Sequence, residues 1–224
     1  MAAFVVIPSI LVHQLSINPD QLWWVYLSLL GGGFIAMLPA VILSERRNIQ
    51  KQVFVSAVAL MTLAMIVLGS SQSGFIIVLM LFIYFAAFNL LEALLPSWLS
   101  KVCPVGNRGT AMGIYSTCQF LGTFAGGILG GWALSTIGTD GVFWLLAFML
   151  LFWCFVALTM TSPKPLQTLI LHVEKTKTNE FIKSVSNIVG VEDILLIKGE
   201  DLAYIKVNKT LIDLESLQPF LNRK

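Results

Sequence analysis

The sequence predicts an all-α membrane bundle of about six transmembrane helices over residues 1–162, a linker over 163–168 and a small α+β domain over 169–224. Composition is the first reason. Hydrophobic residues make up 57% of the 224 residues and charged residues 12%, whereas soluble domains carry about a quarter charged residues. The second reason is a succession of long apolar runs that ends near residue 160. The third is the later change to charged sequence with strand and helix periods.

The apolar runs define the predicted spans. A bilayer-spanning helix needs roughly 20 apolar residues, with some range for tilt. The first run, Ala2–Leu15, is shorter than this and looks like a truncated span. The other five runs are Leu22–Leu43, Val53–Gly69, Phe75–Leu99, Ala111–Leu134 and Val142–Met160. All six tryptophans fall in this part of the chain, most of them near predicted span ends, where interfacial aromatic rings are expected.

Basic residues lie in alternate connections of this bundle. The segments after the second, fourth and sixth spans contain Arg46, Arg47, Lys51, Lys101, Arg108 and Lys164. The segments after the first, third and fifth spans contain no lysine or arginine. Because basic residues in short loops favour the cytoplasmic side, we expect both termini in the cytoplasm. The chain is thus predicted to be a multi-pass protein of a bacterial inner membrane, with the lipid bilayer as its first partner.

The segment after residue 168 has strand and helix periods. Alternation over Leu169–Glu174 predicts a strand, and the spacing of apolar residues over Phe181–Val189 predicts a helix. Two β-rich runs, Val191–Lys198 and Leu202–Lys209, predict a hairpin. Asp213 is a candidate cap for a short last helix. This β-α-β-β-α order is that of a ferredoxin-like sandwich without its last strand, which leaves one sheet edge open to a partner.

Glu92 is the only acid well inside an apolar run. An intramembrane carboxylate is costly unless it is paired or hydrated, so a functional role is its default interpretation. At 1.5 Å per residue, Glu92 lies about 25 Å from Phe75 and hence near the cytoplasmic end of its span. A gate or salt-bridge role is therefore favoured over proton carriage at the midplane. Pro96 offers a flexing point in the same helix. Candidate salt-bridge partners of Glu92 are Arg46, Arg47, Lys101 and Arg108.

The connection between the second and third spans is rich in charge, with Glu45, Arg46, Arg47 and Lys51. Topology determination alone explains these residues, because charge asymmetry orients spans. The alternative is a charge lock that holds two helix ends together in one conformational state. The residues leave both interpretations open.

Small and polar residues mark other candidate positions in the bundle. The fifth span carries a glycine seam, Gly122, Gly126, Gly127, Gly130 and Gly131. In lipid, such residues let helices approach closely, and a sliding interface is the functional version of this packing. Polar residues of the fourth and fifth spans are candidates to line a central cavity, namely Tyr84, Asn89, Tyr115 and Gln119.

Several classes of function have no support in the residues. The net charge of +2 and the lack of a basic run argue against a nucleic-acid partner. The three cysteines, Cys103, Cys118 and Cys154, are widely spaced and form no metal-binding pattern. Neither a phosphate-binding loop nor a nucleophile motif is present. We therefore expect no enzymatic activity, no cofactor and no metal.

A family resemblance adds to this interpretation. The stretch Asn89–Gly131, including Arg108–Ser116 and the glycine seam, resembles the tenth and eleventh helices of major facilitator superfamily transporters, and is similar to the YajR-type, drug/proton antiporter-like branch. That family has a charged motif between helices two and three, with a weaker copy between helices eight and nine. Ser44–Lys51 resembles the weaker copy, with Glu45 in the acidic position and Arg46 in the basic one. Asn48 stands where glycine is usual.

The resemblance implies a fold and a function. It implies that the bundle corresponds to helices seven to twelve, a C-terminal half that needs an N-terminal six-helix half or a second copy as partner, followed by a ferredoxin-like cytoplasmic domain. The expected function is proton-coupled efflux of small molecules by alternating access. The competing interpretation is a membrane sensor or assembly protein without transport activity, in which the helices anchor a tail that binds a ligand or partner.

Overall fold

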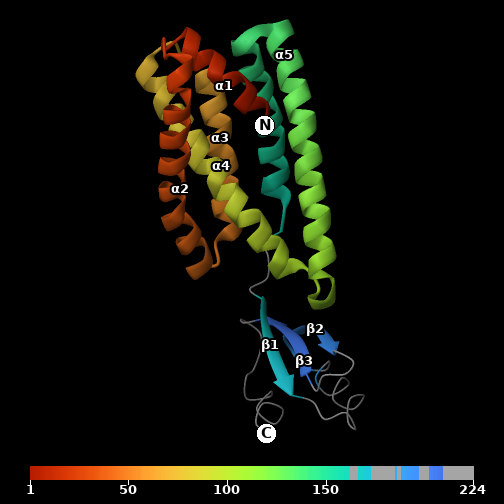
Figure 1. Ribbon diagram of the computed structural model, residues 1–224. Coiled ribbons are helices and arrows are strands. Elements are labelled where there is room, and N and C mark those ends of the chain that lie inside the picture. Colours follow the sequence, from red (N-terminus) through yellow and green to blue (C-terminus); the bar gives the residue numbers. More distant parts are fainter. Residues whose placement is uncertain (162–165, 173–184, 186–187, 197–201, 209–224) are drawn as a thin grey trace. The chain divides into compact units, whose positions relative to one another are not determined.

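The computed structural model describes residues 1–161, 166–172, 185, 188–196 and 202–208 (Figure 1). By its internal contacts the chain forms two compact units. The first comprises Met1–Pro96 and Tyr115–Ser162, and the second comprises Ser97–Ile114 and Pro163–Lys224. The first unit holds most of the helical bundle, and the second holds the sheet together with the segment that joins the last two helices.

The described residues form five α-helices and two short 3₁₀ turns. They are α1 (Ala2–His13), η1 (Pro19–Gln21), α2 (Leu22–Arg46), α3 (Gln50–Leu68), α4 (Gly74–Val102), η2 (Val105–Asn107) and α5 (Arg108–Thr159). Four of these helices, α2 to α5, are long and apolar enough to cross a membrane, whereas α1 is a shorter apolar helix. The predicted all-α apolar bundle is confirmed at this level.

The fifth and sixth predicted runs belong to one element, α5, of 52 residues. The helix reverses at Gly138, whose φ of 71° and ψ of −179° are not helical. This backbone region is open essentially to glycine alone, because a Cβ would collide with the backbone. Figure 1 shows the ribbon of α5 running in one direction, turning and coming back. The connection expected over residues 135–141 is therefore a tight reversal at one glycine rather than a separate loop.

The charged connection between the second and third spans is shorter than the sequence suggested. Glu45 and Arg46 are the last residues of α2, and Lys51 lies in the first turn of α3. Only Arg47–Ile49 joins the two helices. A basic residue is favourable in the last turn of a helix, where the carbonyl ends of the peptide dipoles point outward. The helix accordingly extends through residues that were expected to lie in a loop.

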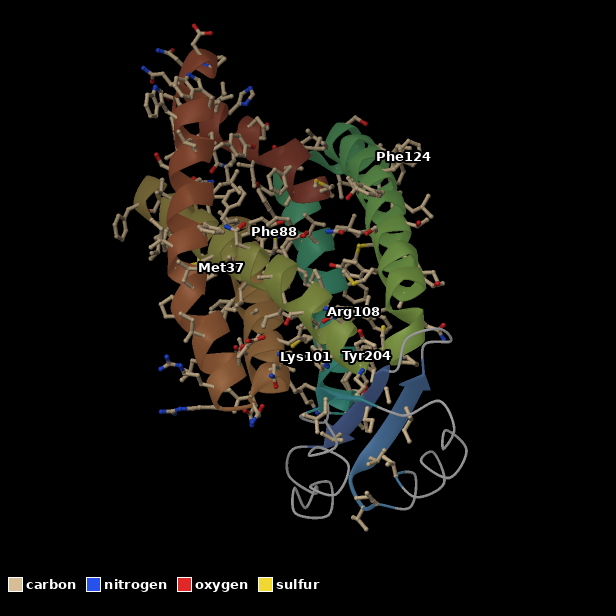
Figure 2. All side chains as sticks on the ribbon, turned by 60° about the horizontal axis from the view of Figure 1, so that its bottom comes forward. Met37, Phe88, Lys101, Arg108, Phe124 and Tyr204 are labelled. Atoms are coloured by element: carbon tan, nitrogen blue, oxygen red, sulfur yellow. The ribbon has the colours of Figure 1, made fainter. Side chains whose placement is uncertain are left out.

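The core of the first unit is built around α1. This helix lacks the length of a span, yet the residues of its inner face are buried, namely Ala3, Val6, Ile7, Ile10 and Leu11. Phe85 of α4 and Phe143 of α5 are fully buried in the same cluster. Met37 of α2 and Phe88 of α4, both labelled in Figure 2, are partly buried against it. The short first helix is therefore covered by its neighbours.

A close helix crossing lies between α2 and α4, at Gly33. A Cβ added to Gly33 would lie 2.9 Å from the backbone nitrogen of Ala86 and 3.0 Å from the carbonyl carbon of Phe85. Next to this crossing, Asn89 Nδ2 donates a hydrogen bond to the carbonyl of Leu30 at 3.2 Å. A small residue and an interhelical hydrogen bond thus act together, as is common in membrane bundles.

The second unit contains a three-stranded antiparallel sheet, β1 (Leu166–His172), β2 (Val191–Leu196) and β3 (Leu202–Asn208), in the order β1-β3-β2. The predicted hairpin is confirmed, since β2 and β3 pair antiparallel, with a register shift between Val191 and Asp193. β1 begins at Leu166 rather than at Leu169, so part of the expected linker is strand. Because both outer strands are antiparallel to β3, they run parallel to each other.

One face of this sheet carries a small core. Its fully buried members are Val185, Ala203, Ile205 and Val207. Val185 is helical and falls in the helix predicted over Phe181–Val189, whereas Val189 is 74% exposed and does not share in the core. The rest of that predicted helix, apart from Ile188 and Val189, and all of the last predicted helix lie outside the described residues.

Candidate functional site

A polar pair joins α4 and α5 within their apolar stretches. Gln119 Nε2 donates to both carboxylate oxygens of Glu92, at 3.0 Å to Oε1 and 2.8 Å to Oε2. The sequence offered four cationic residues as candidate partners of Glu92, and in the structure Glu92 is bonded to a neutral amide. An amide can donate through its nitrogen and accept through its oxygen, so it can bond a carboxylate or, after rotation, a carboxylic acid. The pair therefore accommodates either protonation state of Glu92.

Two polar side chains of α4 form hydrogen bonds with two neighbouring helices. Asn89 reaches the backbone of α2 at Leu30, and Glu92, three residues later, is bonded to α5 through Gln119. Residues three apart are neighbours on a helix surface. Pro96 lies inside α4 and has no N–H to donate to the carbonyl one turn earlier, which is that of Glu92. The helix therefore lacks a backbone hydrogen bond at Glu92, its one acidic residue.

The two tyrosines proposed to line a cavity have different surroundings. Tyr84 is 4% exposed in the core. Its ring is nearly parallel to that of Phe88, with centroids 6.3 Å apart, and meets Phe85 edge-on at 5.5 Å. Tyr84 thus packs among aromatic side chains rather than on an open surface. Tyr115 is half-buried and stands one turn before Gln119 on the same face of α5.

Lys51 connects two helix ends. Its Nζ donates to the carbonyl of Leu158 at 3.0 Å, near the C-terminal end of α5. The last carbonyls of a helix lack helical partners, and a cation there is favoured by the helix dipole. Arg46 and Arg47 are exposed at the end of α2. This contact favours the lock interpretation for Lys51, and no sequence pattern marks a backbone carbonyl as an acceptor so far along the chain.

The departure from the family motif at Asn48 has a structural explanation. Asn48 has a φ of 53°, in the left-handed region. Glycine adopts this conformation freely, and asparagine is among the few other residues that tolerate it. Ile49 N donates a hydrogen bond to the Ser44 carbonyl at 3.1 Å, and this bond closes the turn that contains Asn48. Asn48 therefore stands at a left-handed turn position, of the kind that glycine favours.

We expect Asn48→Val to lower the free energy of unfolding by about 1–2 kcal/mol, because a β-branched residue is strained at this φ. Asn48→Gly should be as stable as the parent chain. Thermal unfolding of the purified chain in mild detergent, followed by tryptophan fluorescence, measures the difference. Asn18→Val is the matched control, since Asn18 is extended with a φ of −60° and makes no side-chain cap bond. Equal stability of the two valine variants would contradict the strain at Asn48.

The glycine seam of α5 is in contact at two of its five positions. A Cβ on Gly130 would lie 2.8 Å from Ala2 Cα, and one on Gly126 would lie 3.5 Å from Ala2 N. Within the described residues, a Cβ on the other three would meet no atom within 4 Å, namely on Gly122, Gly127 and Gly131. The seam thus packs partly on the start of α1. Gly33, which packs against the backbone of α4, was not among the candidate site residues, although the run of three glycines in α2 was the available signal.

Charged candidates near the α4–α5 connection belong to the second unit. Arg108 is exposed at the start of α5, and Lys101 is half-buried near the end of α4. Figure 2 labels both residues. Among the described residues, no group of three or more histidine, cysteine or acidic side chains is placed to hold a metal ion. The chemistry available in the described bundle is hydrogen bonding and charge.

Comparison with known proteins agrees with these features. The chain is 38% identical over 211 residues to the "Inner membrane transport protein YajR" of Escherichia coli (strain K12), which covers 93% of this chain and 46% of that protein. It is 32% identical over 108 residues to an uncharacterized transporter of Buchnera aphidicola subsp. Acyrthosiphon pisum, covering 48% of this chain and 28% of that protein. The chain thus spans less than half the length of these relatives. The family model of the Major Facilitator Superfamily matches residues 1–199, and the chain belongs to that family.

Proposed function

We propose that this chain is the C-terminal half of a secondary transporter that exports small molecules in exchange for protons by alternating access. The observation that carries the proposal is the Glu92–Gln119 pair, in which the one acid that interrupts an apolar run is bonded to a neutral partner on the next helix. Family membership supports transport, and transport by rocking of two six-helix bundles is the general mode of such folds. The chain would act as a carrier and not as an enzyme.

A six-helix partner is part of this proposal. Large apolar side chains on the outer faces of α2 and α5 are more than half exposed, for example Ile35 at 69%, Phe120 at 71% and Phe124 at 68%. Figure 2 shows Phe124 pointing away from the bundle. Lipid covers such faces in a membrane, and a second six-helix unit covers those that line a central cavity. An N-terminal half is the proposed partner, with a second copy of this chain as the alternative.

The proposed setting is a bacterial inner membrane with both chain ends in the cytoplasm. The confinement of lysine and arginine to alternate connections supports this orientation. The printed name of the E. coli relative supports the membrane. The sheet order β1-β3-β2 with parallel outer strands supports a ferredoxin-like tail, because that fold places its third strand between its first two.

The proposed mechanism assigns a gate to the end of the bundle at which α4 and α5 are connected. The hydrogen bonds between Gln119 and Glu92 hold α4 to α5. Protonation of Glu92 changes the charge of this pair, and the amide of Gln119 can still form a hydrogen bond with the carboxylic acid. Asn89 holds α4 to α2 on the other side. Glu45, Arg46 and Arg47, which are exposed at the end of α2, are proposed to tune the cytoplasmic gate. Substrate would enter between this half and its partner.

Reconstitution tests the proposal. The chain is fused to the part of the E. coli relative that it does not cover, and the fusion is placed in proteoliposomes containing ethidium. We expect an imposed proton gradient to drive dye movement several-fold above empty vesicles, and a proton-conducting uncoupler to abolish it. A stable, paired complex that moves neither ethidium nor neutral amphipathic dyes under any gradient would contradict transport and favour the sensor or assembly role.

A further inference from the structure

A lysine of the sheet is buried against the end of α4. Lys206 lies on β3 and is 6% exposed, and its Nζ donates to the backbone carbonyl of Cys103. Both residues belong to the second unit. Burying an ammonium group is costly unless it is bonded to polar partners. The contact is therefore built into the packing of this unit and is not a solvated side chain that happens to lie nearby.

The acceptor is the carboxyl end of a helix. α4 ends at Val102, and Cys103 N still donates to the Leu99 carbonyl at 3.0 Å. The Cys103 carbonyl follows the last helical residue and belongs to the set that helices leave without internal partners. A cation at this position completes the hydrogen bonding and interacts favourably with the helix dipole. Strand β3 thus supplies a cap to α4.

A second contact lies next to the first. Strand β2 packs on η2, the turn between α4 and α5. The compact unit that includes the sheet accordingly takes in Ser97–Ile114, which is the end of α4, the connection and the first turns of α5. Figure 2 labels three side chains of this unit, Lys101, Arg108 and Tyr204. The α4–α5 connection therefore belongs with the sheet.

The borders of this unit fall at weak points of the two helices. In α4 the border follows Pro96, where the helix lacks a backbone hydrogen bond. In α5 it follows Ile114, next to Gly113, and glycine is the most pliable residue in a helix interior. Glu92 and Gln119 lie about one turn beyond these borders, in the first unit.

We propose that Lys206 is a positioning residue that makes the tail sheet and the α4–α5 connection one body. When this body moves, α4 bends at Pro96 and the geometry of the Glu92–Gln119 pair changes. A ligand or partner on the tail then regulates the gate. The consequence for transport rests on the proposed function. The hydrogen bond from Lys206 to the end of α4 and its effect on the Glu92–Gln119 pair do not.

The hydrogen bond from Lys206 to the end of α4 is tested through the thiol of Cys103, which is buried and forms no disulfide. In a full-length chain with Cys118→Ala and Cys154→Ala, we expect Lys206→Met to speed labelling of Cys103 by a small water-soluble maleimide about tenfold, because a charge-assisted hydrogen bond is lost. Lys206→Arg should restore slow labelling. Lys51→Met, which removes the matching lysine contact at Leu158, should leave it unchanged. Labelling at the parent rate in Lys206→Met would overturn the proposal.

Transmission is tested by hydrogen exchange on the same full-length chains. We expect Lys206→Met to raise exchange at the amides around Glu92 and Gln119 at least threefold, and Pro96→Ala to remove this response by restoring the missing helix bond. Protected amides in β1 and β3 confirm that the sheet is folded, and Lys206→Gln replaces Lys206→Met if they are not. A response confined to residues 97–114 would overturn transmission. Because neither readout involves transport, a failed efflux assay would count against the proposed function alone.

Discussion

Glu92→Gln in the fused, reconstituted transporter is expected to reduce proton-driven dye efflux by at least about tenfold, which corresponds to about 1.4 kcal/mol of lost stabilisation. The substitution keeps the size of the side chain and a hydrogen bond to Gln119 but removes the carboxyl group to which the proposed mechanism assigns the proton. Thermal stability should therefore stay within about 1 kcal/mol of the parent. Efflux is measured as the initial rate of dye movement over a series of imposed pH gradients.

The exchange variant Glu92→Gln with Gln119→Glu is the sharpest companion to this measurement. It moves the acid across the same hydrogen bond, from α4 to α5, and leaves the composition of the pair unchanged. We expect partial recovery of efflux with the pH dependence retained. Unchanged efflux and unchanged pH dependence in the single variant Glu92→Gln would remove Glu92 from the gate.

Gly33→Ala should have the largest effect on stability among conservative substitutions in α2. The new Cβ would meet backbone atoms of Phe85 and Ala86 at 2.9–3.0 Å, and backbone atoms cannot rotate away as a side chain can. The helices must separate, which costs about 1–3 kcal/mol for overpacking. The separation also strains the hydrogen bond from Asn89 to Leu30. Loss of stability is measured by thermal unfolding in mild detergent.

Gly31→Ala is the matched control for this prediction. Gly31 lies in the same helix, two positions earlier, and a Cβ on it would meet no described atom within 4 Å. Because alanine is a better helix former than glycine, we expect equal stability or a gain of up to about 1 kcal/mol. A similar loss in both variants would show that helix propensity, and not the crossing with α4, governs this region.

Local features of the chain were open to prediction from the residues. The apolar runs that became α2, α3 and α4 are a property of contiguous sequence, since a span is defined by its own length and hydrophobicity. The β2–β3 pairing was predicted for a similar reason, because a hairpin joins neighbouring segments. Family membership followed from the stretch Asn89–Gly131. Glu92 was recognisable as unusual because an acid stands out in an apolar run.

The partners of these residues were not open to prediction in the same way. Gln119 was a cavity candidate and Glu92 a gate candidate, and only folding brought the amide to the carboxylate. Lys51 and Lys206 each bond a backbone carbonyl, and every residue has one, so the sequence carries no mark of the acceptor. The glycines show the same limit. Gly33 is packed against the backbone of α4, whereas a Cβ on Gly31 would meet no described atom within 4 Å.

By itself the sequence determined that this chain is an apolar helical bundle with a β-containing tail, because hydrophobic period and run length are properties of consecutive residues. The tertiary structure alone decided that Gly138 reverses α5, that Gln119 holds Glu92, and that the α4–α5 connection belongs with the sheet. These features depend on atoms that are distant along the chain and meet only when the helices and strands pack.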